Sequence, residues 1–176
     1  MKKFAAMLFA GTAALLLGAA EMDVNGAFAA AKPGDALPKG WILNNGPKPE
    51  GSHELVQKDG KNVVRINGTK SMYGIATRQR FMVKPGEKYR LSVEANADGV
   101  VANVGMFFYA GSLQKYKYLK GDYAGAVKVN GAKTIAREIT IPAEIKGEVP
   151  TLVGVCFYVQ SPAEAEFANF KLEKLD

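Results

Sequence analysis

Tyrosine and lysine side chains are interleaved in one short stretch in the second half of the chain. It contains four tyrosines and three lysines: Tyr109, Lys115, Tyr116, Lys117, Tyr118, Lys120 and Tyr123. Flat rings can stack on the C–H-rich faces of pyranose sugars, and ammonium groups can pair with carboxylates or sulfates. The four tyrosines are therefore candidate ligand-binding residues for an acidic sugar. The alternative is that Tyr109 and Tyr118 fill the edge of the core while the lysines are solvated.

Two arginines lie close together in residues 74–83, a segment that is predicted to be a strand. Because side chains alternate along a strand, Arg78 and Arg80 are expected on one face and Phe81 on the opposite, core face. Two adjacent guanidinium groups could bind carboxylates or sulfates through paired hydrogen bonds. The alternative is a solvated face on which an arginine pairs with Glu94. On the first interpretation, replacing either arginine weakens binding of an acidic glycan and leaves folding intact.

Trp41, the only tryptophan, is a further stacking candidate, although its place before Ile42 and Leu43 also suits a structural role. Cys156 is the single cysteine, so no disulfide can form within the chain. It lies in an apolar run, which predicts a buried thiol. His53 is the only histidine that could activate it. No pair of carboxylates has a spacing that indicates glycoside hydrolysis, and the chain is predicted not to be an enzyme.

The elements that must position these residues are predicted to be strands. Pro85-Gly86 separates two apolar runs, where Pro presets φ and Gly supplies the positive φ of a tight turn. Asp59-Gly60, between two further apolar runs, is typical of a β-hairpin. No segment after the N-terminal leader has a sustained helical period. The pattern predicts an all-β jelly-roll β-sandwich of about eight or nine antiparallel strands.

Three segments matter most for the placement of the candidate residues. Residues 88–97 and 100–109 are predicted to be two successive strands, separated by a turn at Asp98-Gly99. Residues 111–133 contain several glycines and are predicted to form long loops with one short strand.

The first residues resemble a secretory signal peptide. Lys2 and Lys3 form a basic start, and residues 4–20 are apolar and uncharged. Cleavage is predicted after residue 29; an earlier cut after Ala20 and a retained membrane anchor are the alternatives. Residues 30–39 would then be a leader or linker, and residues 40–176 would form one domain. We expect a secreted or periplasmic protein that has no membrane contact once the peptide is removed.

The chain is moderately basic. Its 23 lysines and arginines exceed its 17 aspartates and glutamates, which leaves a formal net charge of +6. For an exported domain this excess favours an anionic partner such as an acidic polysaccharide. The lysines are scattered along the chain, however, and such a distribution also serves solubility. Nucleic acid is not among the expected partners.

Several motifs occur in the same order as in galactose-binding-like jelly rolls. The chain has, in this order, Gly40-Trp41, Asp59-Gly60, Val83-Lys84-Pro85-Gly86-Glu87-Lys88-Tyr89, Ile141-Pro142-Ala143 and Phe167-Ala168-Asn169-Phe170-Lys171-Leu172. From Gly40 to Leu172 the chain thus resembles the carbohydrate-binding modules that are often fused to bacterial glycanases. The resemblance implies a jelly-roll fold and sugar binding on a concave sheet and its bordering loops.

One departure from that family concerns calcium. The family often carries two consecutive aspartates in the last strand, and the first commonly helps to hold a structural calcium ion. Ala168 and Asn169 occupy those places here, and no acidic residue lies beside Trp41. Calcium prefers six to eight oxygen ligands, including carboxylates. We therefore expect no metal and no cofactor, with Asn169 able to offer at most one carbonyl oxygen to a weak site.

These observations predict a monomeric, non-catalytic carbohydrate-binding protein whose ligand is an acidic or cell-surface polysaccharide. The alternative is a structural or protein-interaction module of the same fold in the cell envelope. A polysaccharide lyase that uses Arg78, Arg80 and Tyr109 is a lesser alternative.

Overall fold

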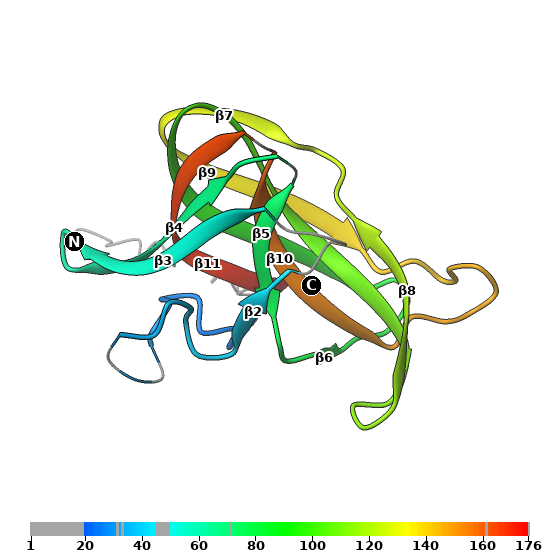
Figure 1. The fold of residues 1–176 in the computed structure, drawn as a ribbon. Helices are drawn as coiled ribbons and strands as arrows, with labels where there is room; N and C mark the ends of the chain where they lie inside the picture. The colour runs from blue at the N-terminus through cyan, green and yellow to red at the C-terminus, as the bar shows by residue number, and fades with distance from the viewer. Residues whose placement is uncertain are drawn as a thin grey trace, which may run out of the picture.

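The computed structural model describes residues 20–30, 32, 34–44, 50–70, 72–160 and 162–175 as an all-β protein (Figure 1). The strands are β1 (Ala20–Met22), β2 (Trp41–Leu43), β3 (Gly51–Lys58), β4 (Lys61–Gly68), β5 (Tyr73–Thr77), β6 (Phe81–Met82), β7 (Lys88–Gly111), β8 (Tyr116–Asp122), β9 (Val127–Thr140), β10 (Leu152–Val159) and β11 (Ala163–Leu175). No helix that could cross a bilayer is found in these described ranges. The predicted all-β class is confirmed.

The strands form one antiparallel sheet that curls around its own core (Figure 1). The order is β2-β5-β10-β7-β11-β4-β3; β8 and β9 also pair with β7, β6 with β10, and β1 with β11. The long strand β7 belongs to both halves of the sheet. Its residues 88–97 pair with β9 and β11, and its residues 102–109 pair with β10. We call the two halves the β11 half and the β10 half.

Two predicted strand boundaries change. Residues 88–97 and 100–109 form one bent strand, in which the register shifts between Ala97 and Val100 and Gly99 takes a φ of 70°. Residues 111–133, predicted to be mostly loop, contain all of β8 and the start of β9. The two exposed tyrosines of this segment, Tyr116 and Tyr118, are therefore held on a strand rather than on a mobile loop.

The two predicted tight turns are confirmed. Gly86 has a φ of 83°, and the Glu87 N–H donates to the Lys84 carbonyl over 3.2 Å, which closes the turn. Asp59 and Gly60 have φ values of 50° and 75°, and Lys58 pairs with Lys61. Positive φ at both central residues is the requirement of a type I′ hairpin.

The core lies between the two halves of the sheet and is rich in aromatic rings. The ring centroid of Phe157 lies 5.5 Å from Phe28, 5.3 Å from Trp41 and 4.6 Å from Phe167. All four side chains are buried. Because Phe28 comes from the segment before β2, that segment is part of the core.

The segment from Ala20 to Ala30 is thus folded onto the sheet. Strand β1 pairs with the end of β11, Val24 and Phe28 are buried, and the Trp41 Nε1–H donates to the Val24 carbonyl over 3.0 Å. Phe28 has a φ of 56°, which is unfavourable for a bulky residue and is held by the packing of its ring. The folded part therefore includes residues that the predicted cut after residue 29 would remove, whereas a cut after Ala20 would retain them. Residues 1–19 of the predicted signal peptide lie outside the described residues.

Candidate functional site

Most of the predicted ligand-binding residues meet on the outer face of the β10 half, on the opposite side of the sheet from the core. Tyr109 on β7 is paired with Tyr118 on β8 and with Leu152 on β10. Phe107 lies two residues before Tyr109 and so points to the same face, while Phe108 between them points into the core. We call this surface the aromatic face; its residues are Arg80, Phe107, Tyr109, Tyr116, Tyr118, Tyr123 and Tyr158.

Tyr116 and Tyr118 form the accessible part of the aromatic face. They are 44% and 52% exposed, whereas Tyr109 between them is 7% exposed. The Tyr109 ring packs edge-on against both, with centroid distances of 5.2 Å to Tyr116 and 5.7 Å to Tyr118. Burial raises the pKa of Tyr109 above its ordinary value, so its hydroxyl stays neutral. Tyr116 and Tyr118, which we call the tyrosine platform, thus rest on a packed third ring.

The lysines that are interleaved with these tyrosines point elsewhere. Because Tyr116 and Tyr118 alternate with Lys117 on β8, the Lys117 side chain leaves the opposite face of the strand. There its Nζ pairs with Glu148 Oε1 at 2.5 Å. Lys120 is paired in register with the inward-facing Phe108. The predicted combination of stacking rings and ammonium groups on one surface is therefore not formed by these two lysines.

Arg80 is a structural residue of this face. Strand β5 ends at Thr77, so the prediction that Arg78 and Arg80 share one strand face is wrong: both lie in the bend between β5 and β6. The Arg80 guanidinium lies 4.5 Å from the Tyr109 ring centroid and 5.6 Å from that of Tyr116. Its Nη1 is within hydrogen-bond distance of the Thr77, Arg78 and Gln79 carbonyl oxygens, at 2.5, 3.0 and 3.2 Å. Arg78 is exposed.

We therefore expect Arg80→Ala to destabilise the fold rather than to act on a ligand alone. The change removes donors to three carbonyls and the support behind Tyr109, and a loss of about 2 kcal/mol in the free energy of unfolding follows. Arg78→Ala is the matched control. It should lower the free energy of unfolding, measured by urea denaturation, by less than about 0.5 kcal/mol. Equal midpoints for both variants would contradict this role of Arg80.

Tyr123 covers the middle of the aromatic face. A Cβ atom added to Gly121 would lie 2.5 Å from the Tyr123 ring, and one added to Gly105 would lie 3.2 Å from it. The ring also packs edge-on against Phe107 and Tyr158, with centroid distances of 5.7 and 5.6 Å. These two glycines therefore make room for Tyr123, which is a partly buried part of the face rather than a free loop residue.

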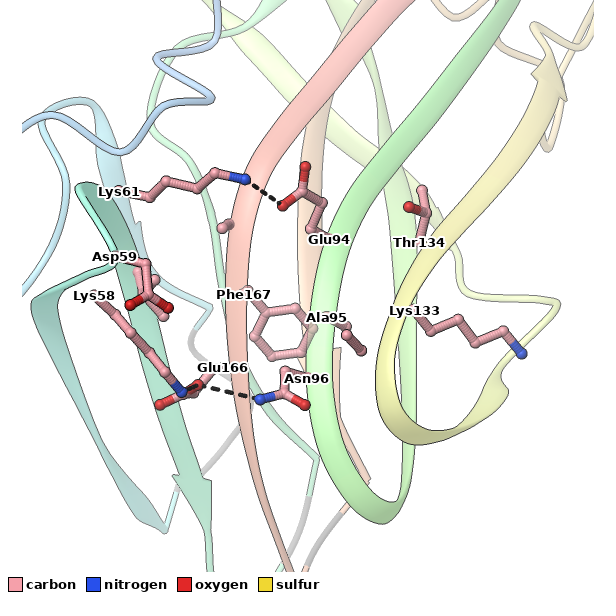
Figure 2. Close-up of a pocket in the computed structure, with 13 residues that line it drawn as sticks. Lys58, Asp59, Lys61, Glu94, Ala95, Asn96, Lys133, Thr134, Glu166 and Phe167 are labelled. Carbon is pink, nitrogen blue, oxygen red and sulfur yellow. Dashed lines mark hydrogen bonds and ion pairs between the residues drawn. The ribbon is translucent and has the colours of Figure 1, made fainter.

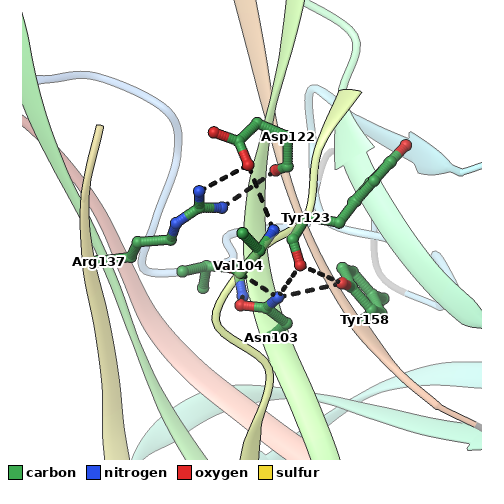
Figure 3. Close-up of polar contacts among 7 residues, drawn as sticks. Asn103, Val104, Asp122, Tyr123, Arg137 and Tyr158 are labelled. Carbon is green, nitrogen blue, oxygen red and sulfur yellow. Dashed lines mark hydrogen bonds and ion pairs between the residues drawn. The ribbon is translucent and has the colours of Figure 1, made fainter. Parts of the chain in front are cut away.

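A buried polar network holds the backbone of Tyr123 in place (Figure 3). Asn103 is fully buried, and its Nδ2–H groups donate to the Tyr123 carbonyl at 2.6 Å and the Ala124 carbonyl at 3.2 Å. The Tyr158 hydroxyl donates to the same Tyr123 carbonyl over 3.2 Å. Buried polar groups that are fully paired fix one arrangement of the chain around them.

An ion pair fixes the residue before Tyr123. Arg137 Nη2 lies 2.6 Å from Asp122 Oδ1 (Figure 3). Partial burial alone would raise the pKa of Asp122, but hydrogen bonds from Arg137 and the Ala124 N–H hold it below its ordinary value. The end of β8 is thus locked to β9.

Trp41 does not reach a ligand surface. It is 3% exposed, and its ring packs against Phe28, Phe157 and Phe170. Trp41 is therefore a core residue and not a stacking residue, because the segment before β2 covers its ring.

Sequence reasoning missed Phe107 and Tyr158. Apart from Asn103, residues 102–109 and β10 are apolar on both faces, so the pattern of residue types does not reveal which side chains leave the core. The one available signal was the single glycine within each of these apolar runs, Gly105 and Gly154.

Cys156 and His53 do not form a nucleophilic pair. The Cys156 thiol is fully buried, which raises its pKa to about 12. His53 Nδ1 lies 2.8 Å from the Tyr73 hydroxyl, and burial lowers the pKa of His53.

Among the described residues, no three His, Cys, Asp or Glu side chains gather where a metal ion could bind. At the place of the family's calcium ligands, Asn169 Nδ2 donates to Glu94 Oε1 over 2.8 Å.

A second hollow lies on the outer face of the β11 half (Figure 2). It has a volume of about 410 Å³ and lies between the β3–β4 hairpin and residues 132–134 of β9. Lys58 pairs with Glu166 at 2.7 Å and Lys61 with Glu94 at 3.2 Å across it. Among the described residues that line this hollow, Phe167 is the one aromatic residue, and it is fully buried. Its charges are matched within the protein, so it is the weaker candidate for a sugar.

Comparison with known proteins identifies the fold. No protein-family model and no curated protein matches the sequence. Among solved structures, the xylan-binding CBM22-1 domain of Paenibacillus barcinonensis Xyn10C is 14% identical, with a TM-score of 0.53 and coverage of 84% of this chain and 99% of that one. The Stig cyclase Fisc from Fischerella sp. TAU is 14% identical, with a TM-score of 0.61 and coverage of 90% and 98%.

A third match is the enzymatically active domain of tailspike protein 4 of bacteriophage CBA120, at 14% identity and a TM-score of 0.55. The match covers 78% of this chain but only 20% of the tailspike chain. At such identities, likeness establishes the fold alone. The chain has the jelly-roll fold of carbohydrate-binding modules, as its motifs predict.

Proposed function

We propose that this protein binds carbohydrate on the tyrosine platform and does not catalyse a reaction there. The observation that carries the proposal is the pair of exposed tyrosines, 44% and 52% accessible, held on a strand above a buried third ring. Rings that are fixed before binding lose little conformational entropy when a sugar stacks on them. The xylan-binding domain of the same fold supports a polysaccharide as the ligand class.

A neutral polysaccharide suits the platform better than an acidic one. Lys117 leaves the other face of β8 and pairs with Glu148, and Arg80 lies behind Tyr109 with its Nη1 directed at backbone carbonyls. The net charge of +6 still attracts polyanions over long range, but that attraction is screened by salt. Salt does not screen the stacking of a sugar on tyrosine rings.

The proposal of a non-catalytic role rests on the state of the nearby ionisable groups. Asp122 and Glu148 are each paired with a cation, Arg137 and Lys117. A lyase would need Arg80 and Tyr109 at the substrate, and here the guanidinium is stacked on a ring that is 7% exposed. We further propose that the protein is exported, since an apolar leader with a basic start precedes β1.

Affinity electrophoresis through gels that contain xylan, hydroxyethylcellulose or alginate tests the function. We expect a neutral polymer to retard the protein equally at low and high salt, because stacking is not screened. Retardation by alginate is expected to disappear at high salt. If no polymer retards the protein, sugar binding is refuted and the alternative of a protein-interaction module in the cell envelope gains weight.

A further inference from the structure

An apolar pocket opens between strand β6, the turn that follows β7, and strand β1. Its volume is about 640 Å³. The larger apolar residues along it are Met22, Met82, Val83, Tyr89, Leu113 and Leu152. Pockets of about 300–1,000 Å³ with a mostly apolar lining and a few polar groups are typical of sites for small molecules.

The floor and the rim of this apolar pocket differ in exposure. Val83 and Tyr89 are buried and form the floor. Met82 and Leu113 stand at the mouth and are 72% and 48% exposed. Large apolar side chains that face water around a hollow mark a surface that another molecule covers. Methionine in particular adapts its shape to what it contacts.

The turn that carries Leu113 is held in place. Thr151 Oγ1 donates to the Gly111 carbonyl over 2.7 Å and accepts from the Gly111 N–H over 3.0 Å. Ser112 and Lys115 exchange backbone hydrogen bonds of 2.9 and 3.1 Å, which closes the turn. One wall of the pocket is therefore preformed.

The polar groups at the mouth leave one positive charge in excess. The Glu87 carboxylate accepts from Lys174 Nζ at 2.6 Å, from the Tyr89 hydroxyl at 2.8 Å and from the Lys84 N–H at 2.8 Å. Glu87 and Lys174 thus neutralise each other. The Lys84 ammonium makes no ion pair with any other residue that the structure describes.

We propose that this pocket binds a small amphipathic anion, with its apolar body against Met82, Val83 and Leu113 and its charged head at Lys84. The proposal is independent of sugar binding, because none of the lining residues belongs to the tyrosine platform. The apolar body gains about 25 cal/mol for each Å² that leaves water, and the head gains an attraction that salt weakens.

Fluorescence titration of the purified protein with 8-anilinonaphthalene-1-sulfonate tests the proposal. We expect saturable binding at one site, displaced by decanoate more effectively than by uncharged decanol. Met82→Glu should weaken dye binding at least tenfold, because it places a negative charge in the mouth. Lys84→Gln should weaken decanoate several-fold and leave decanol unchanged.

Two controls keep the test decisive. Met72 is 40% exposed outside the pocket, so Met72→Glu should leave dye binding unchanged. Tyr118→Ala should also leave it unchanged, which separates this site from the platform. Thermal melting shows whether Met82→Glu is folded. Absence of saturable binding, or equal loss in the Met72 and Met82 variants of a folded protein, would overturn the proposal.

Discussion

A chain shortened to residues 30–176 is expected to be far less stable than a chain that begins at Glu21. The shorter chain lacks β1, the buried Val24 and Phe28, and the carbonyl that accepts from Trp41 Nε1. Loss of one buried phenylalanine costs about 3–5 kcal/mol, and the total stability of a domain is about 5–15 kcal/mol. Urea or thermal unfolding of the two chains measures the difference. Accordingly, N-terminal sequencing of exported protein should begin at Glu21 and not at Ala30.

A point substitution separates the contribution of Phe28 from the effect of shortening. Phe28→Ala in the chain that begins at Glu21 should lose about 3–5 kcal/mol. Ala27→Ser, a change at an exposed neighbour, should lose less than about 0.5 kcal/mol. If residues 30–176 unfold at the same temperature as the longer chain, the segment before β2 is not part of the core in solution.

Replacing both platform tyrosines should abolish most sugar binding. Truncation of an aromatic residue at the centre of a binding surface often costs 2 kcal/mol or more, so Tyr116→Ala with Tyr118→Ala should weaken affinity about 100-fold or more. Each side chain is about half exposed, so the melting temperature should change little. Affinity electrophoresis or calorimetry with the polymer that retards the wild type gives the measurement.

Met72→Ala is the matched control for the platform variant. Met72 is an exposed apolar residue before β5. Its neighbour Tyr73 pairs with Val159 at one end of β10, whereas Tyr109 beneath the platform pairs with Leu152 at the other end, so the loss of Met72 should not alter the affinity. If the wild type binds a polysaccharide and the double tyrosine variant binds it equally well, the sugar site lies elsewhere. The hollow with Glu94 and Glu166 would then be the next surface to mutate (Figure 2).

Local signals were sufficient for the class of fold and for its turns. The Pro85-Gly86 and Asp59-Gly60 turns occur where the residue types require positive φ, and the strands between them follow from alternation. The order of such motifs along the chain also indicated the jelly roll. These features depend on neighbours in sequence, which is why they can be read without the structure.

The break in the strand at Thr77 could not be predicted in this way. Residues 74–83 have no strong turn signal. The bend is stabilised by Arg80, whose guanidinium contacts three carbonyls of the bend and stacks on the ring of Tyr109, a residue of the distant strand β7. A prediction of two arginines on one face therefore failed, because the stabilising partner lies about thirty residues away in sequence.

By itself, the sequence determined that this is an all-β chain with aromatic candidates around residues 109–123. The tertiary structure decided which of those rings are accessible. Pairing of β8 with β7 leaves Tyr116 and Tyr118 exposed and turns Lys117 away, and Asn103 fixes Tyr123 across two glycines. The segment before β2 buries Trp41. Exposure depends on contacts between residues far apart in the chain, and an apolar run has the same composition whichever of its faces meets the core.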